Sequence, residues 1–288
     1  ILELRGNLVD LIADRFQLIL MKSLHRKERI FDVYSKNLDK VFKLFNWKIK
    51  RLDGQEYETI EGKFYACPTC LDLHGLESLH YNDAMNSLTI EDVPPKALGG
   101  KKSLLTCKRC NSTFGHMLDG NLHKTQNLEK LKSGENVSLE AYLELGKKKF
   151  KTELRYSPVE KKFHFISKPN PAFLEEIESI KVWEGEKFHV TVRGGIPEYV
   201  MLALVRIAYL KLFESFGYSY SLSDGGKFVM NQINSGRWKK SETMIFRRKD
   251  LQDKPGLHAV KCKGEWIGFA VIFSLKMDSI ESYMVSAY

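Results

Sequence analysis

Two short cysteine motifs constrain this chain more than any other feature. Cys67-Pro-Thr-Cys70 and Cys107-Lys-Arg-Cys110 each place two thiols on one tight turn, and 36 residues lie between them. Four thiolates with this spacing are a typical ligand set for tetrahedral Zn²⁺. Since four thiolates close the coordination sphere, the sequence predicts a structural zinc and not a catalytic one. A small module that buries little apolar surface would depend on such a metal for its stability.

The bulk composition bounds the class of protein. A chain of 288 residues with 43% hydrophobic and 28% charged residues is long enough for one large domain or for two to three small ones. The net charge of +9 favours a polyanionic partner, although it also fits a basic protein that has none. Charges interrupt the apolar N-terminal stretch, so no signal peptide and no membrane-spanning helix are predicted.

The use of cysteine indicates a compartment. Four of the five cysteines belong to the two motifs, a pattern that favours metal binding over disulfides and therefore a reducing, cytoplasmic setting. The fifth, Cys262, lies in a strand-like run and is predicted to be a small core residue.

Hydrophobic periodicity predicts an α+β fold. Residues 1–47 have the pattern of two amphipathic helices with a break at 23–25, and residues 104–106 and 111–118 predict a strand and a helix around the second cysteine motif. Farther on, we expect a hairpin at 149–167, a helix at 172–180 and a strand at 188–192. A long apolar helix should run from Pro197 to Phe216 and end at Gly217. Strands are predicted at 243–247 and 265–275, the latter central in its sheet because both of its faces are apolar.

These elements predict three consecutive regions. Residues 1–60 form a helical N-terminal region, residues 61–130 form the zinc module, and residues 131–288 form a C-terminal α+β domain.

Between the cysteine motifs lies a second pattern. Glu91-Asp92-Val93-Pro94-Pro95 is followed by Gly99-Gly100, and Asn111 comes directly after the last cysteine. This succession resembles the zinc-knuckle branch of the HNH (ββα-metal) endonucleases. The resemblance implies a ββα module that hydrolyses DNA phosphodiester bonds. It also implies that Glu91 and Asn111 bind a catalytic Mg²⁺ or Mn²⁺. Because proteins of this kind often belong to bacterial antiviral defence or restriction systems, frequently beside an ATPase or sensor subunit, the resemblance also implies such a context and such a partner.

One position departs from the family pattern. The general-base histidine that follows the acidic residue is replaced by Asp92, and a carboxylate is a weaker base than an imidazole at neutral pH. Three interpretations follow. Asp92 serves as a weak base or a further metal ligand; His80 or His116 takes over the role; or the chain is a catalytically disabled form, natural or engineered. We favour the last, because the rest of the pattern is intact.

Basic residues flank the motif and predict contact with DNA. Those nearest to it, proposed to hold phosphates, are Lys96, Lys101, Lys102, Lys108 and Arg109. Two further basic clusters lie at 147–151 and 247–249. Two other hypotheses remain open: a non-catalytic zinc-knuckle subunit that binds nucleic acid or assembles a larger complex, and a purely structural zinc ribbon.

Overall fold

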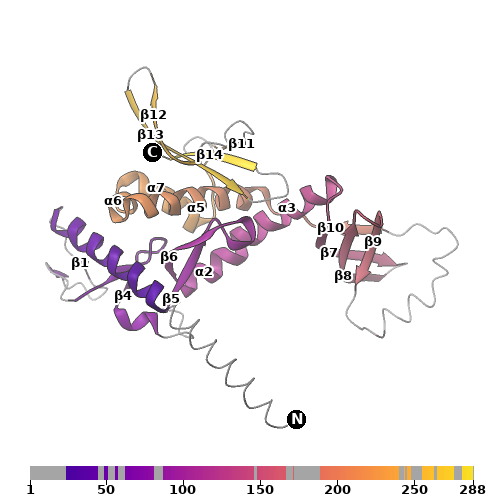
Figure 1. Cartoon of the computed structure of the whole chain (residues 1–288), viewed down its shortest axis with the longest axis horizontal. Coiled ribbons are helices and arrows are strands. Elements are labelled where there is room, and N and C mark those ends of the chain that lie inside the picture. Colours follow the sequence, from indigo (N-terminus) through magenta and orange to yellow (C-terminus); the bar gives the residue numbers. More distant parts are fainter. Residues whose placement is uncertain are drawn as a thin grey trace, which may run out of the picture. The chain divides into compact units, whose positions relative to one another are not determined.

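The computed structural model describes most of the chain. The described residues are 24–44, 49–50, 56–57, 62–80, 87–145, 148–166, 171, 189–239, 243, 245–247, 255–262, 265–275 and 281–287. They form helices and small antiparallel sheets, which confirms the predicted α+β class (Figure 1). The chain divides into two compact units, one of residues 1–115 with 201–288 and one of residues 116–200. This division differs from the three consecutive regions predicted from the sequence, because it joins residues 201–288 to residues 1–115 and divides the predicted module of residues 61–130 after residue 115.

The N-terminal part of the first unit is helical over residues 24–44. Its buried residues recur every three or four positions, as in an amphipathic helix, and confirm the second predicted helix: Phe31, Tyr34, Leu38 and Val41. The first predicted helix lies outside the described residues. Strands β1 (Ile49–Lys50) and β2 (Glu56–Tyr57) form a small antiparallel pair that the sequence pattern did not predict.

Within the predicted zinc module, residues 65–114 form two hairpins and a helix. Strands β3 (Tyr65–Ala66) and β4 (Leu73–His74) pair around the first cysteine motif, and the short helix η1 (Leu76–Leu79) follows. Strands β5 (Leu88–Val93) and β6 (Lys101–Cys107) form the second hairpin, with η2 (Lys96–Leu98) in its loop. Helix α2 (Lys108–Phe114) begins directly after β6. The strand and helix predicted around the second cysteine motif are thus confirmed, although the helix begins three residues earlier.

The loop of the β5–β6 hairpin requires its two glycines. Gly99 adopts a left-handed conformation with φ of 87°, which a residue without a Cβ tolerates best. A Cβ on Gly100 would lie 1.4 Å from the carbonyl oxygen of Pro94, closer than any real contact. The Gly-Gly pair therefore fixes the path between the strand that holds Glu91 and the strand that leads into α2.

The C-terminal segment of the first unit has three helices and a sheet. Helices α5 (Pro197–Phe216), α6 (Tyr218–Ser221) and α7 (Asp224–Ser235) follow one another, and α5 ends before Gly217 as predicted. The sheet has the order β11-β14-β13-β12. Its strands are β11 (Ile245–Arg247), β12 (Gly256–Cys262), β13 (Glu265–Leu275) and β14 (Glu281–Ala287). The interior place of β13 confirms the prediction from its two apolar faces.

An aromatic cluster joins these parts of the first unit. The fully buried ring of Tyr65 on β3 lies 6.0 Å from Phe31 and 6.3 Å from Tyr218, centroid to centroid. Phe213 on α5 stacks on Tyr34 at 4.8 Å. Residues from the N-terminal helix, the zinc module and the C-terminal helices therefore share one core.

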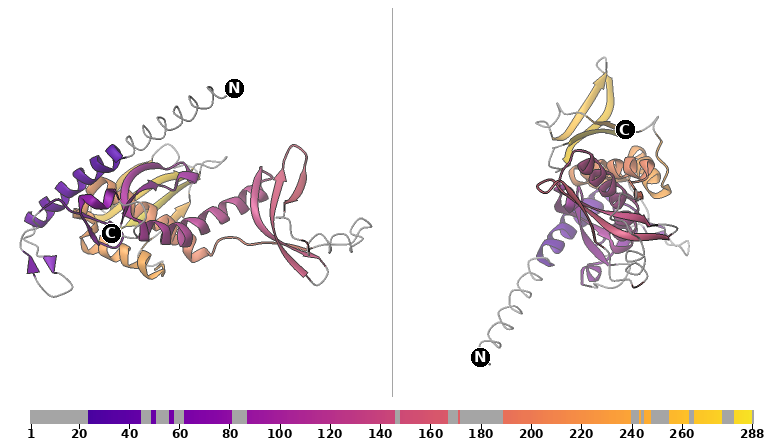
Figure 2. Two further views of the ribbon diagram at one scale, coloured as in Figure 1. Left: turned by 90° about the horizontal axis from the view of Figure 1, so that it is seen from below. Right: turned by 90° about the vertical axis from the view of Figure 1, so that its right-hand side faces the viewer.

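The second unit is a helix packed on an antiparallel sheet (Figure 2, pink strands). It comprises η3 (Gly115–Asp119), which begins at the boundary, α3 (Gly120–Lys132) and a sheet of order β10-β7-β8-β9. Its strands are β7 (Val137–Leu145), β8 (Lys148–Ser157), β9 (Lys162–Ile166) and β10 (His189–Val192). The predicted hairpin at 149–167 and strand at 188–192 are confirmed, β7 was not predicted, and the predicted helix at 172–180 lies outside the described residues.

Candidate metal centre

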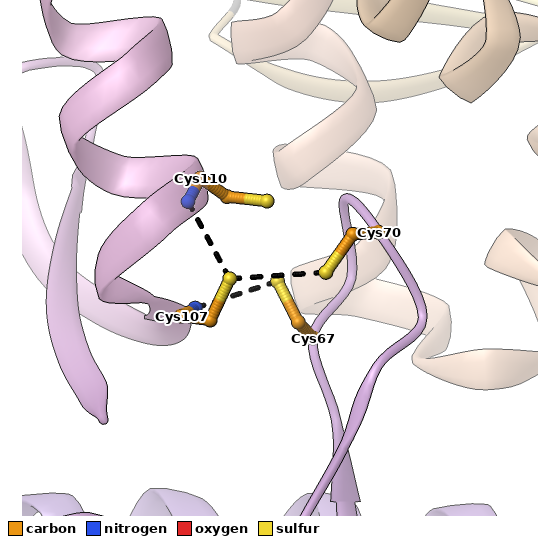
Figure 3. Close-up of side chains that lie close together, drawn as sticks. All are labelled: Cys67, Cys70, Cys107 and Cys110. Carbon is orange, nitrogen blue, oxygen red and sulfur yellow. Dashed lines mark hydrogen bonds between the residues drawn. The ribbon is translucent and has the colours of Figure 1, made fainter. Parts of the chain in front are cut away.

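The four cysteines of the two motifs converge, as the sequence predicted. Their sulfur atoms all lie within 4.8 Å of one another, and Cys70 Sγ is 3.7 Å from Cys107 Sγ. Figure 3 shows one pair coming from the β3–β4 loop and the other from the start of α2, with all sulfurs turned toward a common centre. In a tetrahedral zinc site, Zn–S bonds of about 2.3 Å place the sulfurs about 3.8 Å apart. The four sulfurs are therefore close enough to hold a metal ion, and their chemistry fits Zn²⁺.

Backbone amides support the sulfur atoms. Cys110 N–H donates to Cys107 Sγ at 3.4 Å, so that the Cys107 side chain caps the N-terminus of α2. Cys107 N–H donates to Cys67 Sγ at 3.4 Å and ties the second motif to the first. Leu71 closes the first motif in a left-handed conformation with φ of 63°, an unusual conformation for a residue with a side chain. Such amide contacts favour thiolates, the form that binds metal.

The proximity of the thiols perturbs their protonation. Contacts with the Cys110 and Cys67 sulfurs, assisted by a hydrogen bond with His74, lower the pKa of Cys107 to about 5. Contacts with Cys107 and Cys110 also lower the pKa of Cys70, whereas the neighbouring sulfurs raise the pKa of Cys110. The cluster thus favours partial deprotonation even before a metal compensates the charge.

Two residues around the sulfurs were not assigned to the metal centre from the sequence. His74 on β4 is buried and reaches Cys107, a contact that its place four residues after Cys70 could have indicated. Arg109 hydrogen-bonds to Cys70, which raises the pKa of the guanidinium, and pairs with the Asp72 carboxylate. A cation beside a negatively charged cluster of thiolates is stabilising. Arg109, predicted to contact phosphate, thus also contacts the metal centre.

The C-terminal helices hold the first cysteine motif through its backbone. Tyr209 Oη on α5 donates to the Pro68 carbonyl at 2.6 Å, and Asn234 Nδ2 on α7 donates to the Thr69 carbonyl at 2.9 Å. Tyr218 Oη is bonded to both the amide and the carbonyl of Ala66. Three carbonyls that an isolated zinc loop would expose to water are therefore satisfied by residues far away in the sequence.

The predicted metal ligand Glu91 has an unexpected partner. Its side chain on β5 is only 4% exposed, and its Oε1 lies 3.0 Å from Nη2 of Arg206 on α5, itself 2% exposed. The other oxygen, Oε2, accepts a hydrogen bond from Thr106 Oγ1 at 2.8 Å. Both oxygens of the carboxylate are thus engaged. The sequence pattern did not single out Arg206.

Asn111 lies on the same side of the hairpin as Glu91. Asn111 Nδ2 on α2 donates to Thr89 Oγ1 at 2.9 Å. Thr89 and Thr106 are register partners across β5 and β6, and Thr106 is the residue that donates to Glu91. The two predicted ligands therefore contact one cross-strand threonine pair, one from the strand and one from the helix.

Asp92 follows a bulge in β5. The register shifts between Glu91 and Asp92, and Asp92 then pairs with Lys102 on β6. Asp92 is half-buried, whereas His80 and His116 are exposed. Within the described part of the chain, the four cysteines form the one group of three or more histidine, cysteine or acidic side chains arranged to hold a metal. The structure therefore shows no His/acid cluster at Asp92 among those residues.

The predicted phosphate-binding residues have different surroundings. Lys96, Lys101 and Lys102 are exposed around the β5–β6 loop, and the Lys102 carbonyl accepts a hydrogen bond from the guanidinium of Arg26. Lys108 is half-buried at the start of α2. The three lysines are therefore exposed cations near the end of the hairpin.

The second basic cluster is largely compensated by acidic partners. In the second unit, Lys149 pairs with Glu144 at 2.6 Å and Lys151 with Glu140 at 2.7 Å, all on the face of the sheet that carries charged residues. Of the third cluster, only Arg247 lies within the described residues. The case for phosphate contact thus rests on the β5–β6 loop.

Comparisons with known proteins found no match: no family model fits the sequence, and no curated protein or solved structure matches it. The resemblance to HNH endonucleases therefore rests on the motif residues alone. In the part of the chain that the structure describes, no helix has both the length and the apolar character needed to cross a membrane.

Proposed function

We propose that this chain is a zinc-stapled ββα protein that acts on DNA phosphodiester bonds in the manner of HNH endonucleases, with its activity reduced or lost because Asp92 occupies the position of the general base. One observation carries the proposal. Glu91 from β5 and Asn111 from α2 contact the same threonine pair of the β5–β6 hairpin, directly beside the cysteine cluster. Zinc in that cluster would staple the strand and the helix that present the two side chains.

The donor atoms fit a hard divalent cation. The carboxylate of Glu91 and the amide carbonyl oxygen of Asn111 are the oxygen ligands that Mg²⁺ and Mn²⁺ prefer. When bound, such a cation would neutralise negative charge on a scissile phosphate. Asn111 Nδ2 donates a hydrogen bond to Thr89 on the strand, so the nitrogen of the amide faces the strand and the carbonyl oxygen of Asn111 faces away from Thr89.

The remaining roles belong to groups around the hairpin end. Lys96, Lys101 and Lys102 are exposed cations that would hold DNA phosphates beside the site. Asp92, next to Glu91 and opposite Lys102, would accept the proton of an attacking water. It would be a poor general base, because a carboxylate is a weaker base than an imidazole at neutral pH. Action in bacterial antiviral defence, a cytoplasmic location and an ATPase or sensor partner belong to this proposal through the family resemblance alone.

A second function is favoured by the Glu91–Arg206 pair. A carboxylate that is buried against a guanidinium is already neutralised, which suits a module that binds DNA or assembles with a partner without cleaving. This non-catalytic zinc-knuckle subunit would use the same exposed lysines and would not respond to a restored histidine.

The two functions are separated by restoring the base. Supercoiled plasmid is incubated with Mg²⁺ or Mn²⁺ and the full zinc-loaded chain, as wild type, as Asp92→His and as Asp92→His with Asn111→Ala. Cleavage by Asp92→His alone supports the disabled nuclease, because the matched double variant lacks the amide oxygen. Absence of cleavage by every variant, with DNA binding retained in fluorescence anisotropy, refutes the nuclease and supports the binding subunit. Loss of DNA binding when all three loop lysines become glutamine would confirm the phosphate-contacting surface.

A further inference from the structure

Helix α5 buries one charge in an otherwise apolar stretch. From Leu202 to Leu210 every side chain is buried, and Arg206 is the charged member of that stretch, with 1% of its surface exposed. A guanidinium cannot lose its proton in a protein, so it carries its charge into the core. Burial of such a charge is costly unless a partner of opposite charge compensates it.

Arg206 reaches both elements of the proposed site. Its Nη2 lies 3.0 Å from Oε1 of Glu91 on β5, and its Cζ lies 5.5 Å from the ring centroid of Phe114 at the end of α2. The side chain therefore contacts the strand and the helix that supply the two proposed cation ligands. Buried ion pairs add little net stability over well-packed apolar residues. Stability alone gives no reason to place an arginine at this position.

We propose that Arg206 is a positioning residue that holds the Glu91 carboxylate and sets its affinity for a divalent cation. This inference rests on the proposed function, because it assumes that Glu91 binds a cation there. Arg206 already compensates the single negative charge of Glu91, so a cation that joins the pair meets a positive charge nearby. Affinity for the free protein is therefore low, and a DNA phosphate supplies the missing negative charge. Cation and DNA would thus bind the site cooperatively.

The charged residues next to Glu91 along the hairpin are consistent with this cooperative binding. Asp92 is the acidic neighbour on β5, and Lys102 lies opposite Asp92 on β6. Thr106 and Thr89 contribute neutral hydroxyls. With Arg206 counted against Glu91 and Lys102 against Asp92, the protein offers a divalent cation little net negative charge. Each phosphodiester of bound DNA would bring one negative charge to the site.

The test measures Mn²⁺ affinity and not cleavage. Mn²⁺ binding to the full zinc-loaded chain is followed by electron paramagnetic resonance, with and without a short DNA duplex made resistant to cleavage by phosphorothioate linkages. Wild type, Arg206→Lys and Arg206→Met are compared. In wild type we expect the duplex to tighten Mn²⁺ binding by about tenfold or more, a factor that a single nearby charge can supply. Arg206→Met should bind Mn²⁺ about tenfold more tightly without DNA and lose the effect of the duplex, whereas Arg206→Lys should behave like wild type.

Each other outcome has a distinct meaning. If wild type binds Mn²⁺ equally well with and without the duplex, the role of Arg206 is refuted while the cation site stands; this measurement holds even if Arg206→Met does not fold. If Arg206→Met folds and binds Mn²⁺ no more tightly than wild type, the inference fails in the same way. If no variant binds Mn²⁺ under either condition, the cation site itself is absent, and the proposed nuclease function falls with it.

Discussion

Removal of the Glu91 carboxylate should destabilise the first unit strongly. Glu91→Ala would leave the guanidinium of Arg206 buried without its carboxylate, and the deletion of one partner of a buried ion pair costs about 3–5 kcal/mol. The hydroxyl of Thr106 would lose its acceptor as well, at a cost of about 1 kcal/mol. With a urea m-value of about 2 kcal/mol/M, a total of about 5 kcal/mol lowers the unfolding midpoint by about 2.5 M. Glu91 is thus more than a catalytic candidate that can be replaced without consequence for the fold.

The assay is urea unfolding of the zinc-loaded chain, followed by far-ultraviolet circular dichroism. Glu91→Leu combined with Arg206→Met replaces both charges by apolar groups and should recover most of the loss, because no charge then remains buried. Asp39→Asn is the matched control, since it breaks an exposed ion pair with Lys43 in the same unit and should leave the midpoint unchanged. If Glu91→Ala unfolds at the wild-type midpoint, or if the double apolar variant is no more stable than the single one, the assignment of a buried ion pair is wrong.

Three further predictions concern the zinc module. Cys107→Ser should lose the bound zinc, measured by inductively coupled plasma mass spectrometry, while Cys262→Ser retains it. Gly100→Ala should lower the free energy of unfolding in a urea titration by about 2 kcal/mol or more, because the added Cβ would collide with a backbone carbonyl. In the same titration, the control Gly115→Ala should be neutral or stabilising by up to about 1 kcal/mol, because residue 115 has open space around it and a helical conformation. Tyr209→Phe should cost about 1 kcal/mol through the loss of its hydrogen bond to the first cysteine motif, and a thermal melt showing no change would contradict that anchoring role.

Local patterns predicted the elements of the metal centre well. The spacing of Cys67, Cys70, Cys107 and Cys110 was enough to predict that their sulfurs converge, because each motif fixes a turn and zinc geometry requires four ligands. The long helix α5 was predicted from its apolar circumference. The ion pair of Arg206 with Glu91 could not be predicted in the same way, because a single charged residue in an apolar helix does not indicate which distant strand holds its partner.

Strand β7 shows how propensity can hide a strand. Its sequence alternates buried Val137, Leu139, Ala141 and Leu143 with polar residues, which is the period of a half-buried strand. Alanine, leucine and glutamate nevertheless favour helices, and this weakened the signal. The pairing of β7 with β8 and β10, and its packing on α3, decide the conformation. The return of residues 201–288 to the zinc module was equally inaccessible, because periodicity contains no information about which distant elements pack together.

The anchoring of the first cysteine motif by α5, α6 and α7 has a consequence for the nascent chain. All four cysteines have been synthesised once the chain reaches residue 110. The tyrosines and the asparagine that hold the motif, and Arg206 itself, are synthesised only after the whole second unit. Domains generally fold in the order of their synthesis. A newly made chain would therefore bind zinc around a hairpin whose Glu91 still faces water, and translation of α5 would later close that side.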